Sequence, residues 1–137
     1  MTTDEILNKY KKIAVLGFSQ NSVRPSNHIT IYLQKTGYTV YGVNPGLAGR
    51  EVDGIKCYAS LTEIPDEIEI VNVFRNSRYL PEIIDEILDL AYQPKVIWTQ
   101  LDVVDADSKE RAIAEGIEYV EDKCIYVEHK LNPNVKK

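Results

Sequence analysis

Apolar residues follow two different periodicities along this chain. Short and nearly unbroken apolar runs, typical of strands buried on both faces, alternate with segments in which apolar residues recur every three or four positions, as in amphipathic helices. The runs predict strands at Lys12–Leu16, Thr39–Val43, Lys56–Tyr58, Ile68–Phe74, Lys95–Thr99 and Ile117–Val120. The regular alternation of the two kinds of segment predicts an α/β domain with a parallel sheet.

Helices are predicted between these strands. The clearest one carries on a single face Leu80, Ile83, Ile84, Ile87, Leu88 and Ala91. The others are predicted at Thr3–Tyr10, from Pro25 to Gly37, and from a cap at Asp105 to Gly116. Ser60–Pro65 should form one helical turn, Cys124–His129 fits a strand or a helix, and the tail Asn132–Lys137 should be frayed. Because no repeat or linker interrupts the pattern, we expect one domain spanning residues 1–137, with a core of about residues 12–131.

The connections between the strands limit how the sheet can be built. Right-handed crossovers between parallel strands give, in the simplest case, a Rossmann-like, doubly wound parallel sheet of about five strands in the order 3-2-1-4-5. The chain then reverses direction across the first strand. A ligand is expected at the carboxyl ends of the first, second and fourth strands, where Ser19, Asn44 and Arg75 fall.

The loop after the first strand has the features of an anion site. The apolar run Ile13–Gly17 leads through the polar segment Phe18–Ser26, which carries Arg24, into a predicted helix. Free backbone N–H groups and the positive end of the helix dipole suit a phosphate there, so the loop predicts a nucleotide-type ligand. A tight turn that binds nothing is the alternative. Arg24 and Arg75 each either face the ligand or pair with an acid, which for Arg75 would be Glu82 or Asp85.

Charge is distributed unevenly along the chain. The net charge is −5, yet residues 6–50 contain no Asp or Glu and hold six basic side chains, Lys9, Lys11, Lys12, Arg24, Lys35 and Arg50. Residues 51–137 carry 10 basic and 19 acidic side chains. The basic third contains the predicted anion loop and favours an anionic ligand, although chance scatter of surface lysines would give the same count. The acidic total argues against nucleic acid as a partner.

Composition excludes several other classes of protein. The 137 residues, 44% of them hydrophobic, contain no long uncharged apolar run and no signal peptide, so we expect a soluble cytoplasmic protein that does not bind membranes. Cys57 and Cys124 form no CxxC pair and predict neither a metal site nor a disulfide. Neither His28 nor His129 has a neighbouring Ser or Cys, and His129 is expected at the surface or packed against Tyr126. We therefore expect no catalytic residues.

The usual dinucleotide signals fail at both diagnostic positions. The GxGxxG pattern retains only Gly17, with Ser19 and Ser22 in place of the other two glycines. Asn44 stands where an acid would bind the ribose 2′-OH of NAD at the end of the second strand. With Arg50 nearby, this end of the sheet tolerates a phosphorylated ribose better than the bare ribose of NAD.

Six short motifs together resemble a known family. They are, in order, Gly17–Phe18–Ser19, Arg24–Pro25–Ser26, Val43–Asn44–Pro45, Val73–Phe74–Arg75, Trp98–Thr99–Gln100, and Cys124 with Glu128–His129. Over Lys12–Leu131 the chain resembles the small stand-alone CoA-binding proteins of bacteria and archaea. These proteins are similar to the N-terminal CoA-binding domain of the succinyl-CoA synthetase alpha subunit.

The resemblance implies a role for each segment. The loop segment would hold the CoA diphosphate, Asn44–Pro45 would lie along the adenosine 3′-phosphate region, and Val73–Arg75 would border the nucleotide. Relatives often carry lysine where this chain has Gly46, so either Arg50 replaces it or the 3′-phosphate is recognised more weakly. The full set of candidate ligand-binding residues is Gly17, Phe18, Ser19, Asn21, Arg24, Pro25, Ser26, Asn44, Pro45, Arg50, Val73, Phe74, Arg75 and Gln100.

These observations predict non-catalytic binding of coenzyme A or an acyl-CoA, with the diphosphate at the N-terminus of the first Rossmann helix. The chain would act alone or present CoA to a separate enzyme. Synthetase chemistry would need a phosphorylatable histidine on a glycine-rich loop and a ligase domain, and the sequence predicts neither. The alternative is a regulatory nucleotide-binding module that responds to NAD(H) or ATP.

Overall fold

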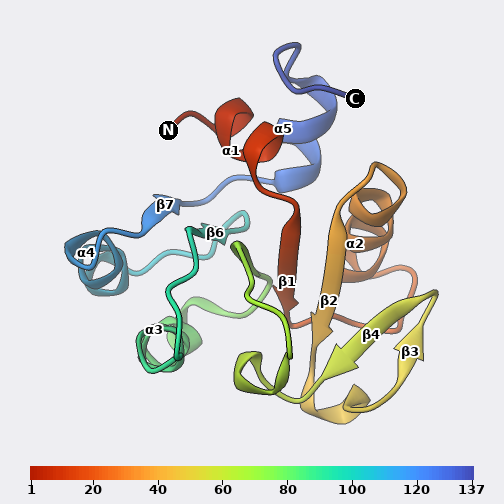
Figure 1. The fold of residues 1–137 in the computed structure, drawn as a ribbon, viewed down its shortest axis with the longest axis horizontal. Helices are drawn as coiled ribbons and strands as arrows, with labels where there is room; N and C mark the ends of the chain where they lie inside the picture. Colours follow the sequence, from red (N-terminus) through yellow and green to blue (C-terminus); the bar gives the residue numbers. More distant parts are fainter.

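A seven-stranded sheet forms the centre of the molecule in the computed structural model, which describes all residues from 1 to 137 (Figure 1). Its order is β3-β4-β2-β1-β5-β6-β7, and every neighbouring pair is parallel except β3 with β4. The strands are β1 (Lys12–Leu16), β2 (Thr39–Val43), β3 (Glu51–Val52), β4 (Ile55–Tyr58), β5 (Ile70–Val73), β6 (Val96–Thr99) and β7 (Glu118–Val120). The parallel strands place their carboxyl ends at one edge of the sheet, as the ligand site requires.

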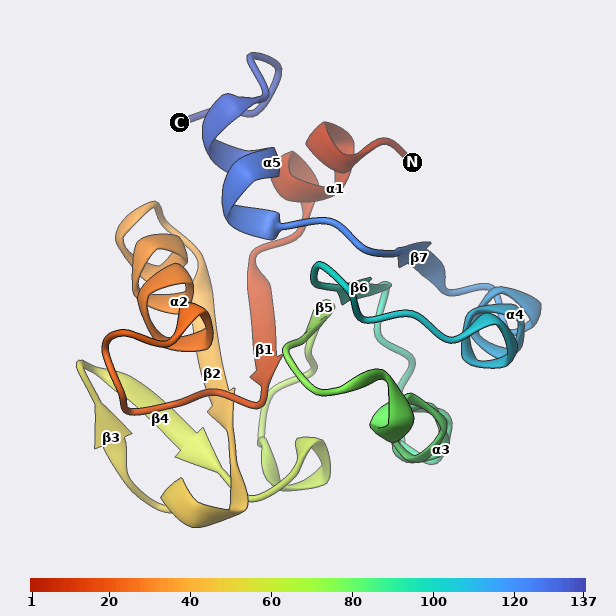
Figure 2. The ribbon, with the colours of Figure 1, turned by 180° about the vertical axis from the view of Figure 1, so that it is seen from behind.

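Helices cover both faces of the sheet (Figures 1 and 2). They are α1 (Thr3–Lys9), α2 (Pro25–Lys35), α3 (Leu80–Leu88), α4 (Ala106–Ala114) and α5 (Ile125–Leu131), with 3₁₀ turns at Pro45–Leu47, Leu61–Glu63 and Ser77–Tyr79. Successive β1 side chains alternate between two cores. Ile13 and Val15 pack with α1, α2 and α5, whereas Ala14 and Leu16 pack with α3 and α4. The fold is therefore the three-layered, Rossmann-like α/β arrangement that the sequence predicts.

The sheet differs from the sequence prediction in strand number and order. It has seven strands rather than about five: β7, which lies within the predicted strand Ile117–Val120, extends one edge, and the unpredicted two-residue strand β3 extends the other. Between these additions the order is β4-β2-β1-β5-β6. β3 turns back onto β4 at Asp53 and Gly54, both of which have positive φ values, 51° and 82°. A two-residue strand is too short to show the alternation that predicts longer ones.

The C-terminal segment also corrects two expectations. Residues 125–131 form helix α5, which settles the ambiguity of Cys124–His129 in favour of a helix. The tail is not frayed: Val135 is 3% exposed, and Asn8 on α1 fastens the tail through hydrogen bonds to Asn134 O (2.9 Å) and from Lys136 N (2.8 Å). One apolar side chain and two polar anchors are enough to hold this end of the chain against α1.

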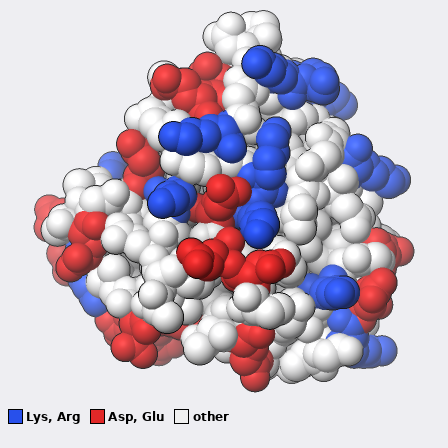
Figure 3. Space-filling model, viewed as in Figure 1, with Lys and Arg blue, Asp and Glu red and all other residues white.

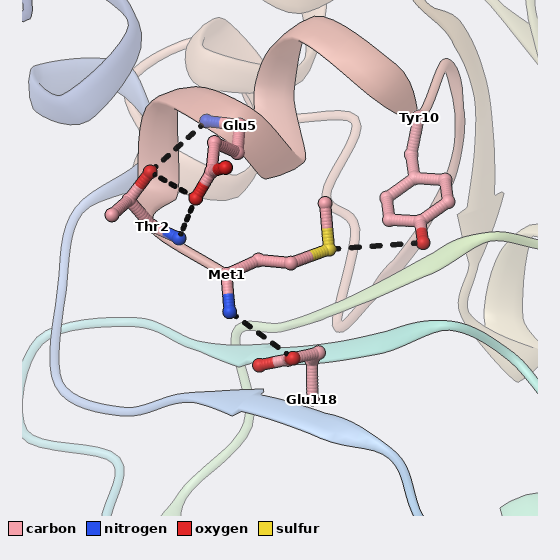
Figure 4. Close-up of polar contacts among 5 residues, drawn as sticks. All are labelled: Met1, Thr2, Glu5, Tyr10 and Glu118. Carbon is pink, nitrogen blue, oxygen red and sulfur yellow. Dashed lines mark hydrogen bonds and ion pairs between the residues drawn. The ribbon is translucent and has the colours of Figure 1, made fainter.

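The N-terminus is held in a similar way (Figure 4). Thr2 caps α1, because its Oγ1 accepts from Glu5 N while the Glu5 carboxylate accepts from Thr2 N. The Met1 ammonium lies 3.2 Å from a carboxylate oxygen of Glu118 on β7. The Tyr10 hydroxyl points to Met1 Sδ at 3.9 Å. These contacts fix α1 beside the edge of the sheet.

His129 is enclosed rather than exposed, contrary to the first alternative from the sequence. It is 1% exposed, its Nδ1 lies 2.7 Å from the Tyr32 hydroxyl, and the rings of Tyr32 and Tyr38 stand edge-on to it. Its Nε2 has no hydrogen-bond partner. Burial lowers the pKa of His129 below its ordinary value, and the charges of Lys137 and Lys11 lower it further.

We expect His129 to make stability depend on pH. The unfolded chain takes up a proton on this side chain near the ordinary histidine pKa, while the folded chain resists it, so the free energy of unfolding should fall as the pH drops below about 6.5. The contribution of His129 to the slope is at most about 1.4 kcal/mol per pH unit. Urea unfolding between pH 5 and 8 should show a flatter profile for His129→Gln than for wild type. The exposed His28→Gln serves as the control, and equal profiles for all three proteins would contradict the account.

Candidate nucleotide-binding site

Gly17 brings three chain segments together at the carboxyl edge of the sheet. Its N–H donates to Val43 O at the end of β2, at 3.0 Å. Its φ is +85°, and a Cβ added here would lie 2.6 Å from Phe74 O and 3.1 Å from Arg75 Cδ, just beyond β5. Only glycine permits this conformation and this approach. The candidate segments after β1, β2 and β5 therefore converge as the topology predicts.

The loop that follows is folded by its own polar groups. Ser19 Oγ accepts from Asn21 N at 3.0 Å, Asn21 Oδ1 accepts from Val23 N at 3.1 Å, and Arg24 N donates to Asn21 O at 3.0 Å. Asn21 thus shapes the loop rather than projecting freely from it. The N–H groups of Ser19 and Gln20, in contrast, donate to no acceptor in the protein.

Helix α2 begins with its anion-attracting end uncovered. Arg24 is the N-cap and makes no side-chain capping bond, Pro25 occupies the first turn, and that turn carries no acidic residue. The Ser26 N–H has no acceptor although the residue is only 6% exposed. The uncovered N-terminus of this 11-residue helix favours a bound anion.

Asn44 lies beside the loop, and the protein itself occupies both ends of its side-chain amide. Nδ2 donates to Phe18 O at 2.9 Å and Oδ1 accepts from Gly46 N at 2.9 Å. The side chain therefore ties the turn after β2 to the loop after β1. Pro45 and Arg50 are exposed on the segment that follows this turn.

The candidate arginines carry no acidic partners. The three ion pairs of the molecule join Met1 to Glu118, Lys109 to Glu121 and Arg111 to Asp85, so Arg24, Arg50 and Arg75 are in none of them. Asp85 is thus engaged by Arg111 rather than Arg75. Arg75 instead lies over the Tyr79 ring, 4.2 Å from its centroid. A hydrogen bond from Arg78 lowers the pKa of the Tyr79 hydroxyl, and the charges of Arg78 and Arg75 act in the same direction.

Other candidate residues lie behind the site, with buried side chains. Phe18 is fully buried, and its ring lies against Gly42, where an added Cβ would be 2.5 Å from Phe18 Cδ2. Val73 is also fully buried. Gln100 is 5% exposed and links β5 to the start of α5, because its Nε2 donates to Asn72 Oδ1 at 2.6 Å and its Oε1 accepts from Ile125 N at 3.4 Å. These residues lie behind the loop after β1 and present no free side-chain polar group to a ligand there.

Two buried amides of this region were missed by sequence reasoning. Asn27, 1% exposed, donates from Nδ2 to Ser19 O at 2.8 Å, and its Oδ1 has no partner. Asn72, fully buried in β5, has no partner for Nδ2. The available signal was an amide at positions where the helical and strand patterns require apolar residues. Asn27 therefore holds the backbone of the loop after β1, whereas the Asn72 side chain contacts another side chain, because its Oδ1 accepts from Gln100 Nε2.

Charge is also distributed unevenly over the surface (Figure 3), and the basic region near α1 and α5 lies at the other end of the sheet from the loop after β1. In this view Asp and Glu prevail over α3 and α4, whereas Lys and Arg are concentrated in the upper part, near α1 and α5. A groove of about 710 Å³ beside α4 is lined by Val104, Asp105, Ala106, Lys109, Glu110, Ile113 and Glu121. Three carboxylates in that lining make it unsuitable for a phosphate, unlike the loop at α2.

The fold and the uncovered loop define a Rossmann-like domain of the nucleotide-binding class. The chain belongs to the CoA binding domain family, whose model matches residues 11–130. It is 37% identical over 127 residues to uncharacterized protein YneT of Bacillus subtilis (strain 168), covering 93% of this chain and 91% of that protein. A solved Thermus thermophilus protein superimposes with a TM-score of 0.89 at 34% identity, covering 96% of this chain and 98% of that one.

Part of a larger enzyme is also similar. The acetate–CoA ligase (ADP-forming) II of Archaeoglobus fulgidus is 29% identical over 89 residues, which are 64% of this chain and 13% of the ligase. This chain therefore matches only a small part of that ligase. None of the five helices has the length and apolar character that a membrane-spanning segment requires.

Proposed function

We propose that this chain binds coenzyme A or an acyl-CoA and performs no chemistry on it. The observation that carries the proposal is the set of unpaired N–H groups at Ser19 and Gln20, in the loop after β1, and at Ser26, in the uncovered first turn of α2. Together they offer several donors to one anionic group in a local field that favours negative charge. Membership of the CoA binding domain family supports CoA as the molecule that carries this anion.

Each part of the site has an assigned task in this proposal. The loop and the start of α2 hold the diphosphate, with the guanidinium groups of Arg24 and Arg75 adding charged hydrogen bonds. The turn after β2 runs along the adenosine, where Arg50 replaces the lysine that relatives often carry at Gly46. All three arginines are free for this role because no carboxylate pairs with them.

The engagement of the side chains near the proposed site supports a binding role without chemistry. Ser19 Oγ is the acceptor of a backbone bond from Asn21 N, and no base lies within hydrogen-bond reach of it. His129 is enclosed by Tyr32 and Tyr38 in the core and has no path to a bound ligand. We propose that the chain supplies only CoA binding, alone or to a separate enzyme, as the short match within the A. fulgidus ligase suggests.

Thermal unfolding with a panel of ligands tests this function. CoA at about 100 times its Kd should stabilise the protein by about 2.7 kcal/mol, because only the folded chain binds it. At equal concentration we expect 3′-dephospho-CoA to stabilise less, and ATP and NAD less again. No stabilisation by CoA, or a larger effect of NAD, would overturn the proposal; the second result would favour the alternative of an NAD-responsive regulatory module.

A further inference from the structure

Two side-chain amides hold consecutive carbonyl groups of the loop after β1. Asn44 Nδ2 donates to Phe18 O at 2.9 Å, and Asn27 Nδ2 donates to Ser19 O at 2.8 Å. Asn44 approaches from the turn after β2, and Asn27 from the first turn of α2. The two peptide planes that begin at Phe18 and Ser19 are therefore fixed from separate elements of the fold.

The orientation of these peptides determines where their N–H groups point. The chain has no cis peptide bond, and in a trans peptide the N–H points away from the carbonyl of the preceding residue. With the carbonyls of Phe18 and Ser19 turned toward the two asparagines, the N–H groups of Ser19 and Gln20 point away from them. These are two of the loop N–H groups that have no acceptor in the protein.

The burial of Asn27 indicates that this arrangement is more than packing. At 1% exposure its Oδ1 has no partner, and an unpaired buried acceptor costs free energy. An apolar side chain of similar size would fill the same space without that cost. Unlike an apolar side chain, the amide supplies a hydrogen-bond donor, and this donor bonds to Ser19 O.

We propose that Asn27 and Asn44 are positioning residues for the diphosphate site: by holding the two carbonyls they aim the N–H groups of Ser19 and Gln20 at the ligand. This inference rests on the proposed function and deepens it. It also changes the role of Asn44, which the family resemblance places along the adenosine 3′-phosphate. Its amide acts through Phe18 on the diphosphate instead.

Comparison of CoA with 3′-dephospho-CoA separates the two roles. We expect Asn27→Leu and Asn44→Ala to weaken the binding of both nucleotides by at least about tenfold. The ratio of the two Kd values should stay as in wild type. A loss confined to CoA in Asn44→Ala would assign Asn44 to the 3′-phosphate and overturn its positioning role. Tyr38→Phe is the matched control, because it removes a buried hydroxyl bond, to Leu7 O at 2.6 Å, that involves no residue of the proposed site. It should bind as wild type.

Stability and pH give readouts that a merely structural role would not produce. Asn27→Leu removes an unpaired acceptor, which stabilises, and the bond to Ser19 O, which destabilises, so its melting temperature should stay near that of wild type while its affinity falls. Asn27→Asp should bind poorly at neutral pH and recover toward wild type, measured at the same pH, as acid protonates the carboxyl and restores a donor to Ser19 O. Affinity that follows melting temperature across these variants, or an Asn27→Asp defect that does not depend on pH, would overturn the inference.

The outcome for wild type distinguishes failure of the proposed function from failure of the positioning role. If wild type binds neither CoA nor 3′-dephospho-CoA, both the proposed function and the positioning role are wrong. If wild type binds both and the asparagine variants bind equally well, only the positioning role fails. Should Asn27→Leu not fold, Asn27→Ala removes the same donor without adding bulk and is judged by the same criteria.

Discussion

Replacing Gly17 with alanine should lower the free energy of unfolding by roughly 2–5 kcal/mol and abolish measurable stabilisation by CoA. The φ of +85° is strained for any residue with a Cβ, and that Cβ would meet Phe74 O at 2.6 Å. The clash is with backbone, so β1 and β5 must separate where the loop begins. Urea unfolding with and without CoA measures both effects.

Gly37→Ala is the matched control for Gly17→Ala. Gly37 has a φ of +104°, but an added Cβ would meet nothing within 4 Å, so only the conformational cost remains. That cost is about 1–2 kcal/mol, and CoA should still stabilise the variant fully. If the two variants lose the same free energy of unfolding, the close approach of Gly17 to Phe74 is not a constraint, and the rigid convergence of the three segments is wrong.

Reversing the charge of Arg24 should weaken CoA binding by about ten- to a hundredfold. A hydrogen bond to a charged group contributes roughly 1.5–3 kcal/mol, and the new carboxylate adds repulsion. Arg24→Glu replaces an exposed side chain that has no ion pair to lose, so the fold should be retained. Isothermal titration calorimetry with CoA measures the loss. Arg75→Glu should behave alike.

Lys35→Glu controls for the change in net charge. Lys35 lies in the last turn of α2, at the opposite end of the helix from Arg24, and is also exposed and without an ion pair. We expect less than a twofold change in CoA affinity, since screening limits the reach of an exposed charge to about 10 Å. Equal losses in Lys35→Glu and Arg24→Glu would attribute binding to overall charge and contradict a local diphosphate site.

The sequence predicted the fold where the pattern was long enough to be unambiguous. The runs of β1, β2, β5 and β6 and the apolar face of α3 are periodic over at least a full turn or several strand residues. Two-residue β3 is too short for periodicity to identify it, and the apolar pattern of Cys124–His129 fits a strand as well as helix α5. The C-terminal tail is held in place by the burial of Val135 and by hydrogen bonds to Asn8. These residues are far apart in the sequence, and only tertiary packing brings them together.

The location of the candidate site also followed from the sequence, because topology alone brings the carboxyl ends of β1, β2 and β5 together. The partners of its side chains did not. Nothing in the sequence shows that Asn44 binds Phe18 O, or that Gln100 is held between Asn72 and Ile125. These contacts depend on side-chain directions that are fixed only when separate elements pack. Asn27 was overlooked for the same reason.

A crystal structure of the protein with bound CoA tests the central claim most directly. The account predicts diphosphate oxygens about 2.7–3.2 Å from the N–H groups of Ser19 and Gln20, at the start of α2, with Arg24 or Arg75 turned toward them. CoA phosphates bound at another surface, with the loop N–H groups facing only water, would contradict it. So would crystals in which saturating CoA leaves the carboxyl edge of the sheet empty.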